Sequence, residues 1–157
     1  MQHNILLLSI RPKYAKQIFE YKTKKVELRR VRTRLREGDI VLVYVSSPEK
    51  IFVGSFEVDG VIQKEASIQE LKNFWNMVKD HAGIERKEFD SYYRGASLVV
   101  GIFLKNVKTF CQPVELERIQ KKLSYLRPPQ SYRYLNEREY EIIKALGENE
   151  ITMMVEK

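Results

Sequence analysis

Cysteine and histidine are scarce in this chain of 157 residues, which contains one cysteine and two histidines. Cys111 has no second cysteine for a disulfide within the chain, and with only His3 and His81 beside it there is no ligand set for a structural zinc site. We expect no cofactor and no metal, although this count leaves open a site made of carboxylates alone. We also expect Cys111 to be a half-buried packing residue.

Long apolar runs are also missing. The longest, at 40–45 and 98–104, have the length of strands and fall far short of the roughly 20 residues that a membrane span needs. The first residues lack both the basic leader and the apolar stretch of a signal peptide. These absences predict a cytoplasmic protein without a membrane partner.

Four common catalytic motifs are absent as well: GxGxxG, GxxxxGK, HExxH and GxSxG. Dinucleotide cofactors, P-loop phosphate binding, zinc-protease chemistry and the serine-hydrolase elbow therefore have no support in this sequence.

The composition is that of one soluble globular domain. Hydrophobic residues make up 43% of the chain and charged residues 31%, which is enough apolar material for a sizeable core without the bias of a disordered chain. No repeat, linker or low-complexity tract indicates a boundary. We therefore expect a single domain over residues 1–157.

The net charge of +7 is confined to one segment. Residues 22–36 contain eight basic side chains against one acidic residue, Glu27, whereas the rest of the chain has 20 basic and 20 acidic residues. The basic residues of this window are Lys22, Lys24, Lys25, Arg29, Arg30, Arg32, Arg34 and Arg36. Such a localised excess points to an anionic partner.

Hydrophobic periodicity predicts the order of the elements. The run 5–10 suits a strand buried on both faces, and Pro12 opens a helix that ends near residues 21–24. From residue 25 the period is two, and a slip at Arg29-Arg30 predicts a bulge or tight bend. Beyond it, Arg30, Arg32, Arg34 and Arg36 share one face of a strand. A turn at 37–39 leads to a strand at 40–46.

The remainder alternates strands with helices. We expect strands at 52–62 and 97–107, in which Gly54 and Gly101 mark bends of a small barrel. A capping box at Ser67 and Glu70 opens a helix, residues 85–93 form a third helix, 115–123 are weakly helical, and Asn136 with Glu139 opens the last helix. The helical spacing of Phe74, Trp75, Phe89, Tyr92 and Tyr93 indicates packing residues.

Five strands with helices between them favour an α+β fold, a small mixed β-barrel that is closed or nearly closed and carries a C-terminal helix. A doubly wound sheet would need regular strand–helix alternation, and residues 25–62 lack it.

The segments SIRPKYA, KKVELRR, EGDIVLVYVSS, FVGSFEV and PPQSYRYL follow one another in an order that resembles ASCH domains of the PUA-like superfamily. These domains commonly carry a pattern close to GxKTxExR after the first helix, followed by a Gly-Asp turn. Lys24, Glu27, Arg29 and the turn Gly38-Asp39 match it, and the resemblance extends from about residue 5 to 135. It implies a PUA-like barrel that binds RNA or another nucleic acid.

The sequence departs from that pattern at two positions, where Lys22 replaces the usual glycine and Lys25 the threonine. Some bacterial members resemble amidohydrolases of acetylated cytidine that use a lysine, a threonine and a glutamate. The lysine corresponds to Lys24, but Glu27 stands where the threonine would be, and Glu57 is the nearest match for the glutamate. If the protein is an enzyme, Lys24, Glu27 and Glu57 are its candidate catalytic residues.

Polar and basic side chains supply the candidate nucleic-acid contacts. Arginine pairs with phosphate and stacks on bases, a carboxylate can accept the amino group of cytosine, and tyrosine stacks on unpaired bases. The resemblance places Ser9 and Arg11, with Ser46 and Ser47, at the same mouth. The candidates are Arg11, Lys24, Lys25, Glu27, Arg29, Arg30, Arg32, Arg34, Arg36, Ser46, Gln130, Ser131, Tyr132 and Arg133.

Each candidate also has a plainer interpretation. The basic segment could be a solvated face, Glu27 a structural partner of Arg29 or Lys24, and residues 127–135 a packed loop. Our first hypothesis is a binding domain for RNA or a modified base, used in transcription or translation control. The second is a hydrolase, either an amidohydrolase or a ribonuclease, and the third is a domain that meets an acidic protein. The first requires free guanidinium groups and a cavity beside Lys24.

Overall fold

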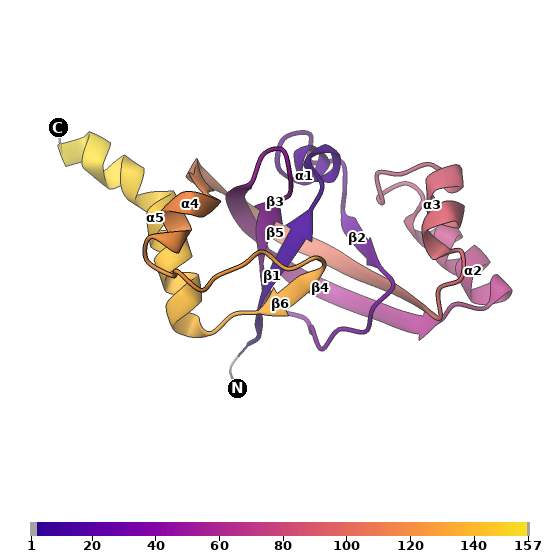
Figure 1. Ribbon diagram of the computed structural model, residues 1–157. Helices are drawn as coiled ribbons and strands as arrows, with labels where there is room; N and C mark the ends of the chain where they lie inside the picture. The colour runs from indigo at the N-terminus through magenta and orange to yellow at the C-terminus, as the bar shows by residue number, and fades with distance from the viewer. Residues whose placement is uncertain (1–2, 157) are drawn as a thin grey trace.

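The computed structural model of the protein describes residues 3–156, with side chains as far as residue 148. Six strands form one mixed sheet in the order β2-β5-β4-β3-β1-β6 (Figure 1). Only β1 and β3 run parallel among these neighbours. The sheet curves into a half-barrel, which confirms the predicted α+β class. The strands are β1 (Ile5–Ile10), β2 (Val26–Arg29), β3 (Ile40–Val45), β4 (Ile51–Glu65), β5 (Leu98–Glu115) and β6 (Tyr132–Tyr134).

The helices begin where the sequence predicts. Pro12 occupies the first turn of its helix, and the Ser67 hydroxyl accepts the backbone N–H of Glu70. The last helix has a reciprocal capping box, because Asn136 Oδ1 accepts the Glu139 N–H at 2.8 Å and Glu139 Oε1 accepts the Asn136 N–H at 2.9 Å. The helices are α1 (Pro12–Phe19), α2 (Ile68–Val78), α3 (Arg86–Tyr93), α4 (Leu116–Gln120) and α5 (Glu137–Glu156).

Successive side chains along a strand point to opposite faces of the sheet and belong to three separate apolar clusters. Leu6 and Leu8 of β1 pack with α1, whereas Leu7 faces the opposite side and packs with α4 and α5. Val26 and Leu28 of β2 join a third cluster under α2 and α3. Figure 1 shows the consequence, with α2 and α3 at one end of the sheet and α4 and α5 at the other. No helix within residues 3–156 is both long and apolar enough to cross a membrane.

The two strand glycines differ in their role. At Gly54 the registers of β4 with β3 and with β5 both shift, and a Cβ atom would lie 2.1 Å from the Lys108 carbonyl oxygen, so the predicted bend is confirmed. At Gly101 the register is unbroken and the prediction of a bend is wrong. A Cβ atom there would lie 2.7 Å from the Phe74 ring, so this glycine makes room for α2.

The arginines of residues 30–36 do not lie on a strand, which corrects the prediction. β2 ends at Arg29, the chain bends at residues 30 and 31, and it then continues to residue 36 without regular secondary structure. We call residues 30–36 the basic strap. Side chains bind its backbone where a partner strand would do so: Gln63 binds both the N–H and the carbonyl of Thr33, and the Tyr134 hydroxyl accepts the N–H of Arg34 at 2.9 Å. The alternation survives only from Arg32 to Arg36, where Thr33 and Leu35 are buried. Val31, at the bend, is exposed like the four arginines.

Cys111 is exposed, against expectation. β5 continues past residue 107 to Glu115, so the cysteine lies inside a strand rather than after one. Strand alternation gives the buried side to its neighbour Phe110.

Lys22 has a φ of +57°, the left-handed conformation that glycine adopts without steric cost. We expect Lys22→Gly to raise the free energy of unfolding by roughly 0.5 kcal/mol and Lys22→Val to lower it by about 1 kcal/mol. Lys25→Gly, at an exposed position three residues later, should lower it by about 0.5–1 kcal/mol. Urea unfolding of the three variants tests this, and destabilisation by Lys22→Gly would contradict it.

Candidate functional site

A cavity of about 920 Å³ lies where β1 and β3 end. Because these two strands are parallel, their carboxyl ends meet at one edge of the sheet and bring the residues that follow them together. Ser9 and Arg11 of the β1 end thus line the same cavity as Ser46 and Ser47 of the β3 end. The resemblance implied this arrangement, and the parallel pairing supplies its physical cause.

Two further segments wall the cavity. Pro128, Pro129 and Gln130 come from the loop that precedes β6, and the Pro129 carbonyl accepts the Ser9 hydroxyl at 2.7 Å. On another side stands α3, with Lys87, Glu88, Ser91 and Tyr92.

The carboxylate of Glu27, on the cavity wall, bridges two cations. Its Oε1 lies 3.6 Å from Lys24 Nζ, and its Oε2 accepts Arg29 Nε at 3.0 Å and Nη2 at 2.7 Å. The side chains of Lys24 and Glu27 are 2% and 7% exposed. Glu27 is therefore a structural ion-pair partner of both Lys24 and Arg29. It also lies on the wall of the cavity.

Burial is the largest influence on Lys24 and lowers the pKa of its ammonium group below the ordinary value, while the charge of Glu27 acts in the opposite direction. The ammonium group also donates to the Ala82 carbonyl and lies 5.0 Å from the centre of the Tyr14 ring. A lysine in this environment can serve as a fixed pocket cation or exchange a proton with a ligand.

Arg29 ties three parts of the fold together. Besides Glu27, its guanidinium donates to the Ser9 carbonyl at 2.8 Å and to the Ser131 hydroxyl at 3.3 Å. It therefore links β2 to the end of β1 and to the loop before β6. Because its donors are engaged in this way, Arg29 holds the cavity walls together and has little capacity left to bind a ligand.

Tyr14 and Glu88 connect the core to α3. The Tyr14 hydroxyl donates to Glu88 Oε2 at 2.8 Å, and Lys13 contributes a second contact at 3.3 Å. Burial, assisted by this hydrogen bond, raises the pKa of Tyr14 to about 12, and the same hydrogen bond lowers the pKa of Glu88. At neutral pH the cavity therefore presents a neutral phenol and an ionised carboxylate. Within the described residues no group of three or more His, Cys, Asp or Glu side chains is placed to hold a metal ion.

The predicted contact residues separate into two groups. Six of them line the cavity: Arg11, Lys24, Glu27, Arg29, Ser46 and Gln130. The others do not line it and are Lys25, Arg30, Arg32, Arg34, Arg36, Ser131, Tyr132 and Arg133.

Glu57 lies away from Lys24, which corrects the proposed catalytic set. Glu57 pairs with Ile40 at the start of β3, whereas Tyr44 and Ser46 line the cavity at the other end of that strand, roughly 13–20 Å further on at 3.3 Å per residue. Glu57 instead lines a separate hollow of about 480 Å³ under α5 and contacts Lys105 at 3.4 Å.

Side chains of the segment 130–134 mostly serve the fold. Arg133 Nη2 donates to the buried Glu139 at 2.9 Å, the Tyr132 hydroxyl donates to the Arg32 carbonyl, and Tyr134 holds the strap. Gln130, in contrast, is exposed at the cavity. The predicted recognition loop is therefore represented in the cavity by Gln130 and the two prolines.

The strap arginines have no acidic partner. Within the described side chains, the arginines in ion pairs are Arg29, Arg86 and Arg133, and none of Arg30, Arg32, Arg34 and Arg36 is among them. Two of the four rest on aromatic rings instead, Arg34 at 4.5 Å from the centre of the Tyr134 ring and Arg30 at 5.2 Å from that of Tyr92.

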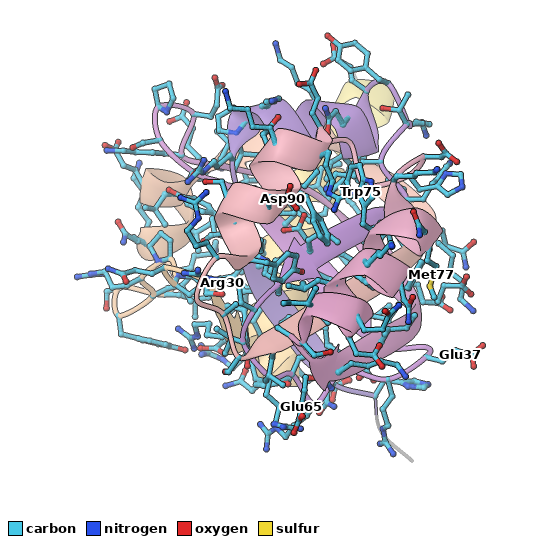
Figure 2. All side chains as sticks on the ribbon, turned by 90° about the vertical axis from the view of Figure 1, so that its right-hand side faces the viewer. Arg30, Glu37, Glu65, Trp75, Met77 and Asp90 are labelled. Atoms are coloured by element: carbon cyan, nitrogen blue, oxygen red, sulfur yellow. The ribbon has the colours of Figure 1, made fainter. Side chains whose placement is uncertain are left out.

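Arg30 joins the strap to the cavity. Its Nη1 donates to the Tyr92 carbonyl at 3.0 Å, and the side chain of Tyr92 lines the cavity. Figure 2 shows Arg30 beside α3. The row of strap guanidinium groups thus begins at the cavity rim.

The contribution of α3 was not predicted. The aromatic pattern indicated packing for Tyr92, and the structure confirms burial for its neighbours Phe89 and Tyr93 but leaves Tyr92 36% exposed at the cavity. Lys87, Glu88 and Ser91 were also missed. Helical spacing showed that these residues share the polar side of the helix, but it could not show that the cavity lies there.

Residues 6–126 match a family model described as "Domain of unknown function (DUF365)". The match includes every element that lines the cavity except the loop with Pro128, Pro129 and Gln130.

Proteins named "Large ribosomal subunit protein uL22" from two strains of Ureaplasma parvum serovar 3 are 27% identical to this chain over 130 residues. The match covers 83% of this chain and 39% of each relative. The chain therefore spans about two fifths of the length of the curated relatives that it matches.

Three solved structures share the fold. ASCH from Zymomonas mobilis has a TM-score of 0.80 at 20% identity, over 90% of this chain and 94% of that one. The N-terminal domain of Staphylothermus marinus McrB has a TM-score of 0.58 at 12% identity, covering 94% and 99%. Human THYN1, in complex with DNA that contains 5-methylcytosine, has a TM-score of 0.54 at 12% identity, covering 92% and 98%. The ASCH-type fold inferred from the motif residues is thereby confirmed.

Removal of the Glu27 carboxylate should destabilise the protein strongly. We expect Glu27→Leu to lower the free energy of unfolding by about 3–5 kcal/mol at pH 7, because it leaves two buried cations unpaired. Lys24→Met, which leaves the Arg29–Glu27 contact intact, should cost much less. Urea unfolding tests both variants, and equal losses would contradict the central role of the carboxylate.

The lowered pKa of Lys24 also predicts a pH dependence. Above that pKa and below the ordinary lysine value, the unfolded chain keeps a proton that the folded chain has lost, so stability should rise with pH toward about 10. Lys24→Met removes this titration. The difference in unfolding free energy between wild type and Lys24→Met should therefore change as the pH is raised toward about 10, and a constant difference would contradict the lowered pKa.

Proposed function

The chain belongs to the DUF365 family. We propose that it is a nucleic-acid-binding domain whose cavity receives one unpaired nucleotide. One observation carries the proposal: a row of four exposed arginines, without acidic partners among the side chains that the structure describes, begins at the rim of the cavity. The binding unit is the single domain of residues 1–157.

The cavity supports recognition of a single base or nucleotide. About 920 Å³ is near the upper end of the range of pockets for small organic ligands. Its walls offer a tyrosine ring at Tyr92, a carboxamide at Gln130 and hydroxyl groups at Ser46 and Ser47. Unpaired bases are recognised by this combination of stacking and hydrogen bonds to their edges.

The charge of the cavity suits a phosphorylated ligand. Four cationic side chains line it, Arg11, Lys24, Arg29 and Lys87, against the two carboxylates of Glu27 and Glu88. Glu27 is satisfied by its own two cations, so Arg11 and Lys87 remain exposed toward an incoming phosphate.

RNA is the first polymer to test. The curated relatives, of which this chain covers 39%, are named as proteins of the large ribosomal subunit, and human THYN1, which has the same fold, was solved with DNA that contains 5-methylcytosine. We extend the proposal to recognition of RNA, including modified bases, and to control of transcription or translation through that binding.

A hydrolase acting on a modified nucleoside or on RNA is the second candidate. It is favoured by the burial of Lys24 in the cavity wall with its pKa lowered and a carboxylate 3.6 Å away. Metal-free turnover of an acylated nucleoside by the wild type, lost in Lys24→Met, would establish it.

Binding to fluorescent single-stranded RNA, duplex RNA and DNA across a salt series tests the proposal. With four to six phosphate contacts, the logarithm of the affinity should fall with that of the salt concentration at a slope of about −3 to −5. The triple variant Arg30→Ala, Arg32→Ala, Arg34→Ala should bind about tenfold more weakly or worse, with a shallower slope, because three phosphate contacts are lost.

The matched control removes three exposed lysines that lie away from the strap and the cavity: Lys72→Ala, Lys79→Ala, Lys121→Ala. It lowers the net charge equally and should retain nearly the affinity of the wild type. Equal losses in both triple variants would show that binding follows net charge alone, and unchanged binding by the strap variant would eliminate the strap as the interface.

A further inference from the structure

The strap is held in place by contacts to its backbone, and among the described side chains its guanidinium groups have no acidic partner. Its backbone is fixed by Gln63 at Thr33, by Tyr134 at Arg34 and by the buried Asp39, which accepts the N–H of Arg36 at 2.8 Å. Gln63 and Tyr134 come from β4 and β6, and Asp39 follows the turn at the end of the strap. A ligand therefore meets an ordered row of arginines and does not have to order the segment first.

The spacing of this row matches a single chain of phosphates. Exposed and buried side chains alternate from Arg32 to Arg36, and on a backbone with this alternation side chains two residues apart lie about 6.6 Å from one another on the same face. Arg32, Arg34 and Arg36 thus form a line of evenly placed charges, and Arg30, at the bend that precedes them, lies at the cavity end. A linear row of this kind fits the backbone of one strand whose terminal base enters the cavity.

The far end of the row is closed by negative charge. Directly after Arg36, Glu37 lies with Glu57 and Asp59 around one ammonium group, Lys105 Nζ, at 3.6, 3.4 and 3.7 Å. Three carboxylates around one ammonium leave an excess of negative charge, which repels a phosphate. Arg30 and Glu37 appear on opposite sides of the view in Figure 2, so the row crosses the molecule between the cavity and this acidic cluster.

We propose that the strap is a track of limited length for one nucleic-acid strand, about five nucleotides long, with one nucleotide in the cavity and one phosphate at each strap arginine. The acidic cluster of Glu37, Glu57 and Asp59 ends the track. This inference rests on the proposed function and adds to it the length of the ligand, its single-stranded form and its end point.

A length series tests the track. The probes are oligouridylates of 2 to 12 nucleotides that carry a 5′ fluorescein, and the measured quantity is the dissociation constant at low salt. For the wild type, affinity should rise with length to about five nucleotides and change little beyond about six. A 12-nucleotide hairpin duplex of the same charge should bind at least tenfold more weakly than the single strand.

Removal of the acidic cluster should lengthen the track. In Glu37→Gln, Glu57→Gln, Asp59→Asn the plateau should move to seven nucleotides or more, and the 12-nucleotide probe should bind roughly three- to tenfold more tightly, because Lys105 and the open surface become available to phosphate. The control Glu115→Gln, Glu117→Gln, Glu141→Gln makes the same change in net charge near α4 and α5 and should keep the plateau at five.

The outcomes separate this inference from the proposed function. Wild-type affinity that keeps rising through 12 nucleotides, or a plateau that the cluster variant does not move, would overturn the track while leaving nucleic-acid binding intact. Tighter binding of the duplex would overturn its single-stranded form. Failure of the wild type to bind any probe would overturn the proposed function and the track together.

Discussion

The structure depends on one carboxylate. Glu27 lies between Lys24 and Arg29 with both cations nearly buried, and each cation continues into another part of the fold. Lys24 reaches the Ala82 carbonyl ahead of α3, and Arg29 reaches the end of β1 and the loop before β6. These contacts join three walls of the cavity at a single point. Without the carboxylate, two desolvated positive charges would face each other. Formation of the cavity therefore depends on the Lys24–Glu27–Arg29 contacts, which we call the ion chain.

The same constraint explains why neighbouring arginines have different roles. Arg29 and Arg133 are engaged by buried carboxylates and act within the protein. The strap arginines, in contrast, are not needed to hold the strap, because Gln63, Tyr134 and Asp39 satisfy its backbone and Thr33 with Leu35 anchors it in the interior. Their guanidinium groups are therefore available to an external anion. Side-chain hydrogen bonds thus attach the strap to the half-barrel in place of a ladder of main-chain hydrogen bonds. The exposed surface of the strap arginines remains accessible.

The location of the cavity follows from the single parallel pair of the sheet. β1 and β3 end together, so the polar residues after them converge, and the helical pair α2 and α3 covers the adjoining edge through its contact with β2. The α3 wall is attached to the core by the Tyr14–Glu88 hydrogen bond and by Arg30 at Tyr92. Changes on the exposed side of α3 would therefore alter which ligand fits while leaving the ion chain in place.

The sequence by itself determined the features that depend on local periodicity and local charge. It predicted the helix starts at Pro12, Ser67 and Asn136, the bend at Gly54, the turn at Gly38-Asp39, the α+β class and the concentration of basic residues, because capping, alternation and turn chemistry act over a few neighbouring residues. It could not show that Arg29 is held by a buried carboxylate while Arg30 is not. It also could not place Tyr92 at the cavity, separate Glu57 from Lys24, or show that residues 30–36 have no partner strand. Those outcomes depend on which distant segments become neighbours, and only the packing of β1, β3, α3 and the loop before β6 decided them.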